Sequence, residues 1–189
     1  MATQAPHDYP GHLVEDWQLA DGTRLRIRPI RADDLEMHTA FVASLSNETG
    51  YHRLLSPRKP QSDELWRMTH IDYDRELALI ATAAVDGAEQ QMGVVRYVRG
   101  DTPETAHIAE FAIVIADAWQ HHGLALKLMR KLIDAATAAG VKQLADITLY
   151  DNVGMLALAR KLGFTLQRDP GNPNVTRLRL ALDAPAPAP

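Results

Sequence analysis

The sequence predicts a mixed α/β domain, α+β in detail, built around one central sheet. Strand-like and helix-like segments alternate along the chain, which is typical of helices packed against a sheet. A strand, a helix and a second strand follow one another between Thr105 and Tyr150, and this order implies at least one parallel strand pair. The length of 189 residues suffices for one domain with a sizeable core and is short for two.

The N-terminal half is expected to begin with a strand and to continue with helices. Thr23–Ile30 alternates apolar residues with arginines, which is typical of a half-buried strand. Asp33 or Asp34 can cap a helix that runs to about Leu45. Two further helices are expected, from Ser46 to Leu55 and from Ser62 or Asp63 to about Ile71.

The remaining elements alternate between strands and helices. Leu124–Ala139 is the clearest helix, because it carries one apolar stripe at helical spacing and meets a stop signal at Gly140. The expected strands are Glu76–Asp86, Gln91–Arg99, Thr105–Ile115, Gln143–Tyr150, Phe164–Arg168 and Val175–Leu182, with a further helix at Asn152–Leu162.

The two ends of the chain lack the pattern of packed elements. Residues 1–12 are expected to form a flexible arm, and 184–189, rich in alanine and proline, a flexible tail. One domain is expected over 13–183.

Composition excludes several classes of protein. The chain has no cysteine, which rules out disulfides, thiolate catalysis and Cys-type zinc sites, and its scattered histidines do not indicate a metal site of another kind. The net charge of −4 and the absence of a basic face argue against nucleic-acid binding. No apolar stretch is long enough to span a membrane, so no membrane partner is expected and a cytoplasmic location is the simplest reading.

The most informative segment is a turn between an apolar strand and the clearest helix. Its residues are Gln120, His121, His122, Gly123, Leu124 and Ala125. A helix start leaves backbone N–H groups without partners and favours negative charge, and a glycine allows an anion to approach closely. The turn therefore predicts a phosphate-binding site, to which Gln120 and the two histidines add side-chain donors. An ordinary solvated turn is the alternative.

This turn resembles the acetyl-CoA-binding motif Q/R-x-x-G-x-G/A of the GNAT superfamily of N-acetyltransferases. Asn152 with Leu162-Gly163-Phe164 is similar to the family's second cofactor-side helix, and Arg28-Pro29-Ile30-Arg31 to its usual opening. Leu45–Arg53 and Ile71–Arg75 resemble the GNAT domain of Pat-type protein lysine acetyltransferases. The resemblance covers roughly 23–182.

The resemblance implies a mostly antiparallel sheet in which one parallel pair, Thr105–Ile115 and Gln143–Tyr150, splays apart around the cofactor. Pantetheine would lie along Ile113, Val114 and Ile115. The pyrophosphate would sit on the amides of His121 to Ala125, with Asn152 contacting the pantetheine side.

A general base is needed because a lysine amine, with a pKa of ~10.4, is almost wholly protonated at neutral pH. Glu110 is the leading candidate. Strand alternation places it on one face with Ile108, Ala112 and Val114, where burial would raise its pKa. The family's catalytic glutamate occupies the matching place, whereas a surface or salt-bridged glutamate is the alternative.

The family's usual tyrosine acid is missing. Its position holds Ala159, so the thiolate leaves without help or another group protonates it, for which Tyr150 is a candidate. A backbone N–H near Ile113 would stabilise the oxyanion.

The sequence thus predicts direct transfer of acetyl from acetyl-CoA to a primary amine, with a protein lysine side chain favoured over a small amine. An acetyl-CoA-binding sensor or partner-binding module is the alternative of a different class. The acceptor, the acyl-chain preference and the oligomeric state are not readable from the sequence.

Overall fold

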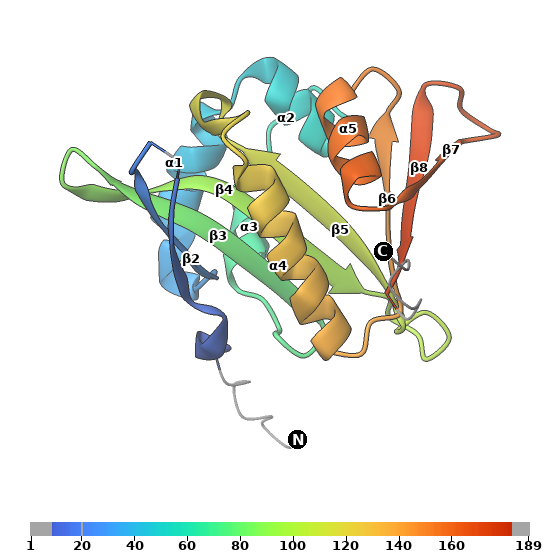
Figure 1. Cartoon of the computed structure of the whole chain (residues 1–189), viewed down its shortest axis with the longest axis horizontal. Coiled ribbons are helices and arrows are strands. Elements are labelled where there is room, and N and C mark those ends of the chain that lie inside the picture. The colour runs from blue at the N-terminus through green and yellow to red at the C-terminus, as the bar shows by residue number, and fades with distance from the viewer. Residues whose placement is uncertain (1–8, 20, 183–189) are drawn as a thin grey trace.

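One eight-stranded sheet forms the centre of the computed structural model, which describes residues 9–19 and 21–182 (Figure 1). The strand order is β1-β2-β3-β4-β5-β6-β8-β7, and every neighbouring pair is antiparallel except β5 with β6. The mixed fold class and the single parallel pair expected from the sequence are confirmed. The strands are β1 (Glu15–Gln18), β2 (Arg24–Pro29), β3 (Glu76–Val85), β4 (Ala88–Arg99), β5 (Ile108–Ile115), β6 (Gln143–Leu149), β7 (Thr165–Arg168) and β8 (Val175–Ala181).

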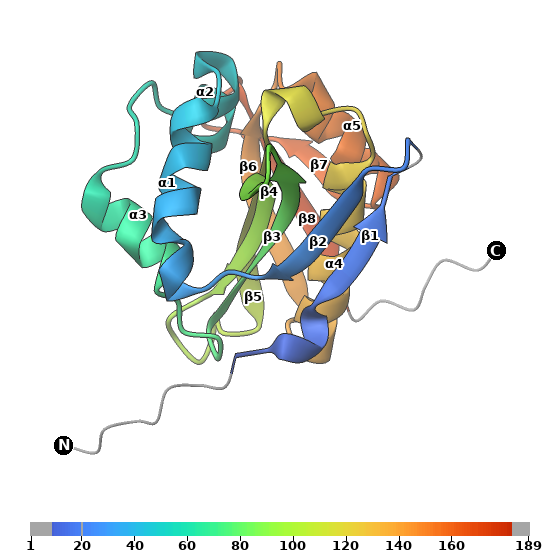
Figure 2. The same ribbon diagram turned by 90° about the vertical axis from the view of Figure 1, so that its left-hand side faces the viewer.

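Helices cover both faces of the sheet. Helices α1, α2 and α3 lie on one side, and α4 and α5 lie on the other (Figure 2). Their bounds are α1 (Leu35–Ser44), α2 (Asn47–Leu54), α3 (Ser62–Thr69), α4 (Leu124–Ala138) and α5 (Val153–Lys161).

Each face has its own apolar core. Leu124, Leu128 and Leu132 are the buried stripe of α4, and they pack with residues of β3, β4 and β5. On the opposite face a smaller cluster joins Phe41 of α1 to Val94 of β4 and their neighbours. The sheet is therefore buried on both sides at its centre, as the continuous apolar run of β3 indicates.

The largest differences from the predicted strands are two shifted boundaries and one strand that was not predicted. The strand expected from Thr105 begins only at Ile108, because residues 102–106 close a turn in which Thr105 and Ala106 donate backbone hydrogen bonds to Thr102. Strand β4 begins earlier than expected, at Ala88. Strand β1 was not predicted, since Glu15–Gln18 offers four residues with one large apolar side chain among them.

The expected terminal arms are only partly described. Residues 1–8 and 183–189 lie outside the described residues. Within the expected N-terminal arm, the Tyr9 hydroxyl donates to the Pro29 carbonyl at 3.1 Å, the Arg31 guanidinium lies 5.0 Å from the centre of the Tyr9 ring, and Gly11–Leu13 forms a 3₁₀ turn. The division into one domain over 13–183 stays a prediction.

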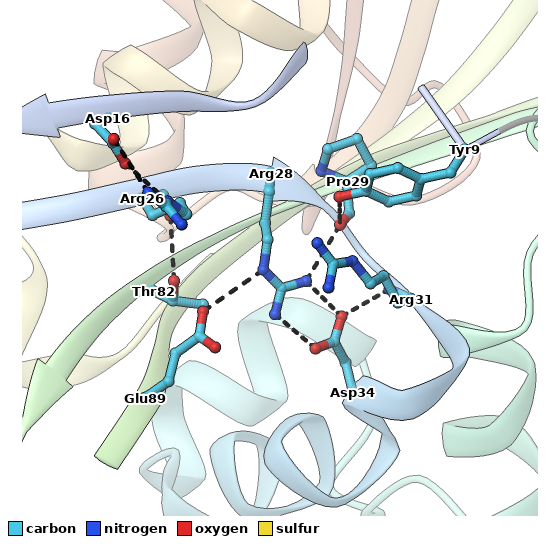
Figure 3. A network of polar contacts seen from close by, with 9 residues as sticks. All are labelled: Tyr9, Asp16, Arg26, Arg28, Pro29, Arg31, Asp34, Thr82 and Glu89. Carbon is cyan, nitrogen blue, oxygen red and sulfur yellow. Dashed lines mark hydrogen bonds and ion pairs between the residues drawn. The ribbon is translucent and has the colours of Figure 1, made fainter. Parts of the chain in front are cut away.

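A buried ion pair joins β2 to the start of α1 (Figure 3). Arg28 donates to both carboxylate oxygens of Asp34, at 2.7 and 2.6 Å, and the two residues are 4% and 6% exposed. Asp34 also accepts the backbone N–H of Arg31 at 2.7 Å. These contacts fix the point where the chain leaves the sheet to form the helical layer.

No helix among residues 9–19 and 21–182 is both long and apolar enough to cross a membrane.

Candidate active site

The parallel strands β5 and β6 separate part of the way along their length. Their pairing extends from Ile108 beside Gln143 to Glu110 beside Ala145 and then stops, although both strands continue. A cleft of about 510 Å³ occupies the region beyond, lined by β5 from Ala112 to Ile115 and by β6 from Asp146 to Thr148. The splayed pair expected from the resemblance is therefore present.

The turn before α4 forms one end of this cleft. Gln120, His121, Gly123 and Ala125 line it. His121 and Gly123 both have positive φ angles, 65° and 81°, and Gly123 is the N-cap of α4 without a side-chain cap. Within the described part of the chain, none of the backbone N–H groups from His121 to Ala125 donates a hydrogen bond. These amides are the donors that an anion at a helix N-terminus requires.

The side chain of Gln120 has a different partner from the expected phosphate. Its Nε2 donates to Thr49 Oγ1 and to the Ile115 carbonyl, both at 3.2 Å. Gln120 thus ties the turn to β5 and to α2. The start of α2 is held to the same region, because Asp117 accepts from Oγ of the N-cap residue Ser46 at 2.6 Å and from Thr49 Oγ1 at 2.7 Å.

Most of the expected cofactor residues come together. Eight of the ten line the cleft: Ile113, Val114, Ile115, Gln120, His121, Gly123, Ala125 and Asn152. His122 is exposed and Leu124 is 1% exposed in the core, and neither lines the cleft.

Asn152 is also a helix cap. Its Oδ1 accepts the backbone N–H of Met155 at 3.1 Å, which satisfies one donor at the start of α5. Its side chain therefore stabilises α5 while lying at the wall of the cleft, and its Nδ2 takes no part in that cap.

Glu110 lies at the point where the two strands part, but it is exposed. Its register opposite Val98 of β4 confirms that it shares a face with Ala112 and Val114. The burial that was expected for Glu110 is therefore absent. Glu110 lines neither of the two cavities described here.

A second carboxyl group, on Asp146 of β6, was missed by the sequence reasoning. Asp146 is partly buried and lines the cleft. Burial raises the pKa of Asp146 to about 6, and the nearby negative charge of Glu110 acts in the same direction, against the Ile147 amide and the positive charge of Arg53. The signal available in the sequence was an acidic residue within the otherwise uncharged strand Gln143–Tyr150.

Neither of the two positions considered as a source of the leaving-group proton has a polar group in the cleft. Ala159 is fully buried inside α5 and packs in the main core, so this position offers no polar group. Tyr150 is 53% exposed and does not line the cleft.

A second cavity, of about 540 Å³, lies between the sheet and helices α1, α2 and α3. It shares Arg53, Leu54, Ala112 and Val114 with the cleft, so the two spaces meet at the middle of β5. No group of three or more potential metal-ligating side chains occurs in the part of the chain that the structure describes.

Comparison with known proteins agrees with this geometry. Residues 24–165 match the family model described as an acetyltransferase (GNAT) domain. An acetyltransferase of Pseudomonas aeruginosa is 36% identical over 172 residues, covering 90% of each chain. The chain therefore belongs to the GNAT family of acetyltransferases and takes its acyl group from acetyl-CoA, as the sequence predicted.

Two solved structures are similar over most of their length. The GNAT domain of Streptomyces lividans Pat is 31% identical, with a TM-score of 0.82, covering 92% of this chain and 99% of that one. A phosphinothricin acetyltransferase of Sinorhizobium meliloti, solved with acetyl-CoA, has the same fold at 20% identity, with a TM-score of 0.65 over 82% of this chain and 86% of that one.

Proposed function

We propose that this acetyltransferase moves the acetyl group directly from acetyl-CoA to a primary amine. The observation that carries the proposal is the cleft between β5 and β6 with its turn of unused amides at one end. The pyrophosphate lies on the amides of His121 to Ala125, and pantetheine runs along Ile113–Ile115. This orientation brings the thioester to the middle of β5, where the second cavity opens.

The chemistry needs a neutral amine. Its nitrogen attacks the thioester carbonyl, the N–C bond forms, and the C–S bond breaks as the thiolate leaves. The nitrogen gives up a proton to a base, and the thiolate takes one to become the CoA thiol. A backbone N–H near Ile113 stabilises the oxyanion.

Glu110 is the proposed general base, supported by its place at the point where the strands part. Because it is exposed, it acts through one bridging water more readily than by direct contact. Asp146 is the second candidate, because it lines the cleft and its pKa is raised to about 6, close to the range that suits a base at neutral pH.

For the leaving group, unassisted departure is supported better than protonation by Tyr150, which does not line the cleft. A free thiol has a pKa of only ~8.5, so its thiolate is a tolerable leaving group.

The proposed acceptor is the side chain of a protein lysine, a choice supported by the likeness to the GNAT domain of Pat. A small-molecule amine is a second candidate, favoured by the cavity of about 540 Å³ beside the thioester end of the cleft. The cytoplasmic location expected from the sequence belongs to the same proposal.

Release of the CoA thiol with a panel of proteins and amines tests this function. We expect turnover that falls by ~10² or more in Glu110→Gln, the usual contribution of a general base. A fall of that size in Asp146→Asn and not in Glu110→Gln would move the role to Asp146. Tight binding of acetyl-CoA with no turnover on any acceptor would contradict the proposal and favour the sensor.

A further inference from the structure

The second cavity carries an excess of positive charge. Its apolar walls come from α1, α3, β4 and β5, and include Val42, Leu45, Met68, Val94 and Val114. Among its lining residues four are basic and one is acidic: Arg53, Arg58, Lys59 and Arg96 against Glu48. Arg58 is paired with Glu64 at the rim, 2.6 Å away, so the remaining charge belongs mainly to the deeper residues.

Two arginines line the cavity, and their positive charges are only partly compensated. Arg96 of β4 is 3.1 Å from Glu76, with side chains 13% and 22% exposed. The guanidinium of Arg53, on α2, has neither an ion pair nor a hydrogen bond within residues 9–19 and 21–182. Burial lowers the pKa of Arg53 and the positive charge of Arg96 lowers it further, whereas the negative charge of Asp146 acts in the opposite direction. The two guanidinium groups thus share one close ion pair, that of Arg96 with Glu76, and Arg53 has none among the described residues.

A polar atom without a partner lies in the same wall. His38 of α1 is 3% exposed, and its Nδ1 lies 3.1 Å from Gln91 Oε1. The opposite ring nitrogen, Nε2, is buried and makes no hydrogen bond with any described residue. Buried polar atoms are normally satisfied, so an unpartnered ring nitrogen in a wall that also carries Arg53 and Arg96 is typical of a binding pocket.

The cavity also opens at the correct place for an acceptor. Ala112 and Val114 of β5 line both spaces, and Arg53 lies on their common border. A ligand with its negative end at the two arginines can extend an amine toward β5, where the thioester lies in the function proposed above.

We propose that this cavity is the site of the second acceptor candidate named above, a small primary amine, and that it selects one that also carries a carboxylate, which binds between Arg53 and Arg96. This inference rests on the proposed function for the reaction that the acceptor undergoes. The binding of the carboxylate to the two arginines does not depend on it. Guanidinium groups bind carboxylates through paired, charge-assisted hydrogen bonds, and two of them in a partly dry pocket discriminate strongly against a neutral analogue.

The test compares matched acceptors. Release of the CoA thiol is measured with the common α-amino acids and with their carboxamides, which keep the amine and lose the negative charge. We expect at least one amino acid to show a kcat/KM about 10-fold or more above that of its amide.

Variants of the two arginines then test whether these residues cause the preference for the acid over its amide. Arg96→Gln lowers kcat/KM for that acid by about 10- to 100-fold and leaves its amide within about 3-fold, because only the charged contact is removed. Arg24→Gln, an exposed arginine of β2 outside both cavities, is the matched control and keeps the preference. Arg53→Gln provides a second variant if the loss of Arg96 leaves Glu76 too poorly compensated to fold.

Calorimetric binding of the same amino acids without acetyl-CoA separates this inference from the reaction. Acids that bind wild type and lose binding in both variants support the site even where no thiol is released, in which case the proposed function alone fails. If the amino acids and their carboxamides bind and react equally well, the proposed carboxylate site is wrong, although the proposed acetylation of a primary amine still holds. Peptides with a lysine beside an aspartate that react faster than every amino acid also overturn it, since the acceptor is then a protein.

Discussion

At the scale of single residues, two glycines with the same backbone conformation allow an effect on folding to be distinguished from an effect on cofactor binding. Gly123 and Gly140 both have φ of 81°, and a methyl group on either meets no atom within 4 Å. Gly123 lines the cleft and precedes α4, whereas Gly140 follows the same helix.

We expect Gly123→Ala and Gly140→Ala to cost similar stability, about 1–2 kcal/mol, because each places a side chain in the left-handed region. Only Gly123→Ala weakens CoA binding, by about tenfold or more, since its methyl group faces the approaching pyrophosphate. Calorimetry with CoA and with S-acetylpantetheine, which lacks the pyrophosphate, measures both effects. Equal losses of CoA affinity in the two variants would contradict the placement of the pyrophosphate.

The buried Arg28–Asp34 pair makes a second residue-scale prediction. Asp34→Asn removes the carboxylate that receives two Arg28 hydrogen bonds and leaves the buried guanidinium with only the longer Glu89 ion pair, at 3.5 Å, so urea denaturation should show a loss of about 3–5 kcal/mol. Asp16→Asn breaks the exposed Asp16–Arg26 pair and serves as the control, with a much smaller loss of stability. A small loss in Asp34→Asn would show that Glu89 or water compensates the Arg28 guanidinium.

Asp146 gives a pH-dependent prediction. Its pKa is raised to about 6 in the folded protein, above the unfolded value of ~3.9. The folded state therefore holds the proton more tightly, and the stability gained from this group is present below pH ~4 and lost as the pH rises through about 6. Asp146→Asn removes this loss, so its advantage over wild type should grow between pH ~4 and ~6 to at most about 3 kcal/mol and then stay constant.

Urea denaturation of wild type and Asp146→Asn at several pH values measures that difference. A difference that does not change between pH ~4 and ~7 would show that Asp146 ionises normally.

The two carboxyl groups also show what a strand pattern can reveal. Alternation gave the face of Glu110 correctly, because side-chain direction follows from the period of a strand. Its exposure depends on which elements cover that end of β5, and the environment of Asp146 depends on α2 and on the divergence of the strands. Both are set by tertiary packing, which local sequence does not contain.

At the scale of elements, α2 forms a wall shared by the two cavities. Its first residues are held by Asp117, which accepts from the Ser46 N–H and hydroxyl and from the Thr49 hydroxyl. Ser46 in turn accepts the Thr49 N–H at 3.2 Å as the helix cap. The stability of α2 therefore depends on a turn far away in the sequence.

Asp117→Ala should loosen α2 without unfolding the sheet. We expect the backbone amides of Asn47–Leu54 to exchange with solvent about tenfold faster, the effect of roughly 1.4 kcal/mol of local stability. Hydrogen exchange measures this directly. Asp63→Ala, which breaks the exposed Asp63–Arg67 pair of α3, is the control and should leave α2 unchanged. Unchanged exchange in Asp117→Ala would show that packing alone holds α2.

Long, strongly patterned elements were predicted well and short polar ones were not. The stripe of α4 has the period of a helix, and the apolar run of β3 has the length of a buried strand and is bounded by a turn at Gly87. Strand β1 is short and polar, and it forms because its backbone pairs with β2, from Glu15 beside Ile27 to Gln18 beside Arg24. Such a strand is stabilised by its neighbour, so its own side chains show little of the pattern that predicts a strand.

At the scale of the whole molecule, one face of the sheet carries the larger core and the other carries the second cavity. The face under α4 and α5 holds the larger core, whereas α1, α2 and α3 stand over the second cavity. The divergence of β5 from β6 joins this cavity to the cofactor cleft at Ala112 and Val114. The turn motif allowed the cleft to be predicted from sequence, but the charge of the cavity comes from residues of separate elements, such as Arg53 and Arg96, which no single motif unites.

A crystal structure of the acetyl-CoA complex tests the central claim most directly. The account predicts pyrophosphate oxygens within about 3 Å of the backbone nitrogens of His121 to Ala125, with the thioester beside Ala112 at the opening of the second cavity. A pyrophosphate bound elsewhere, with those amides turned toward protein atoms, would contradict it.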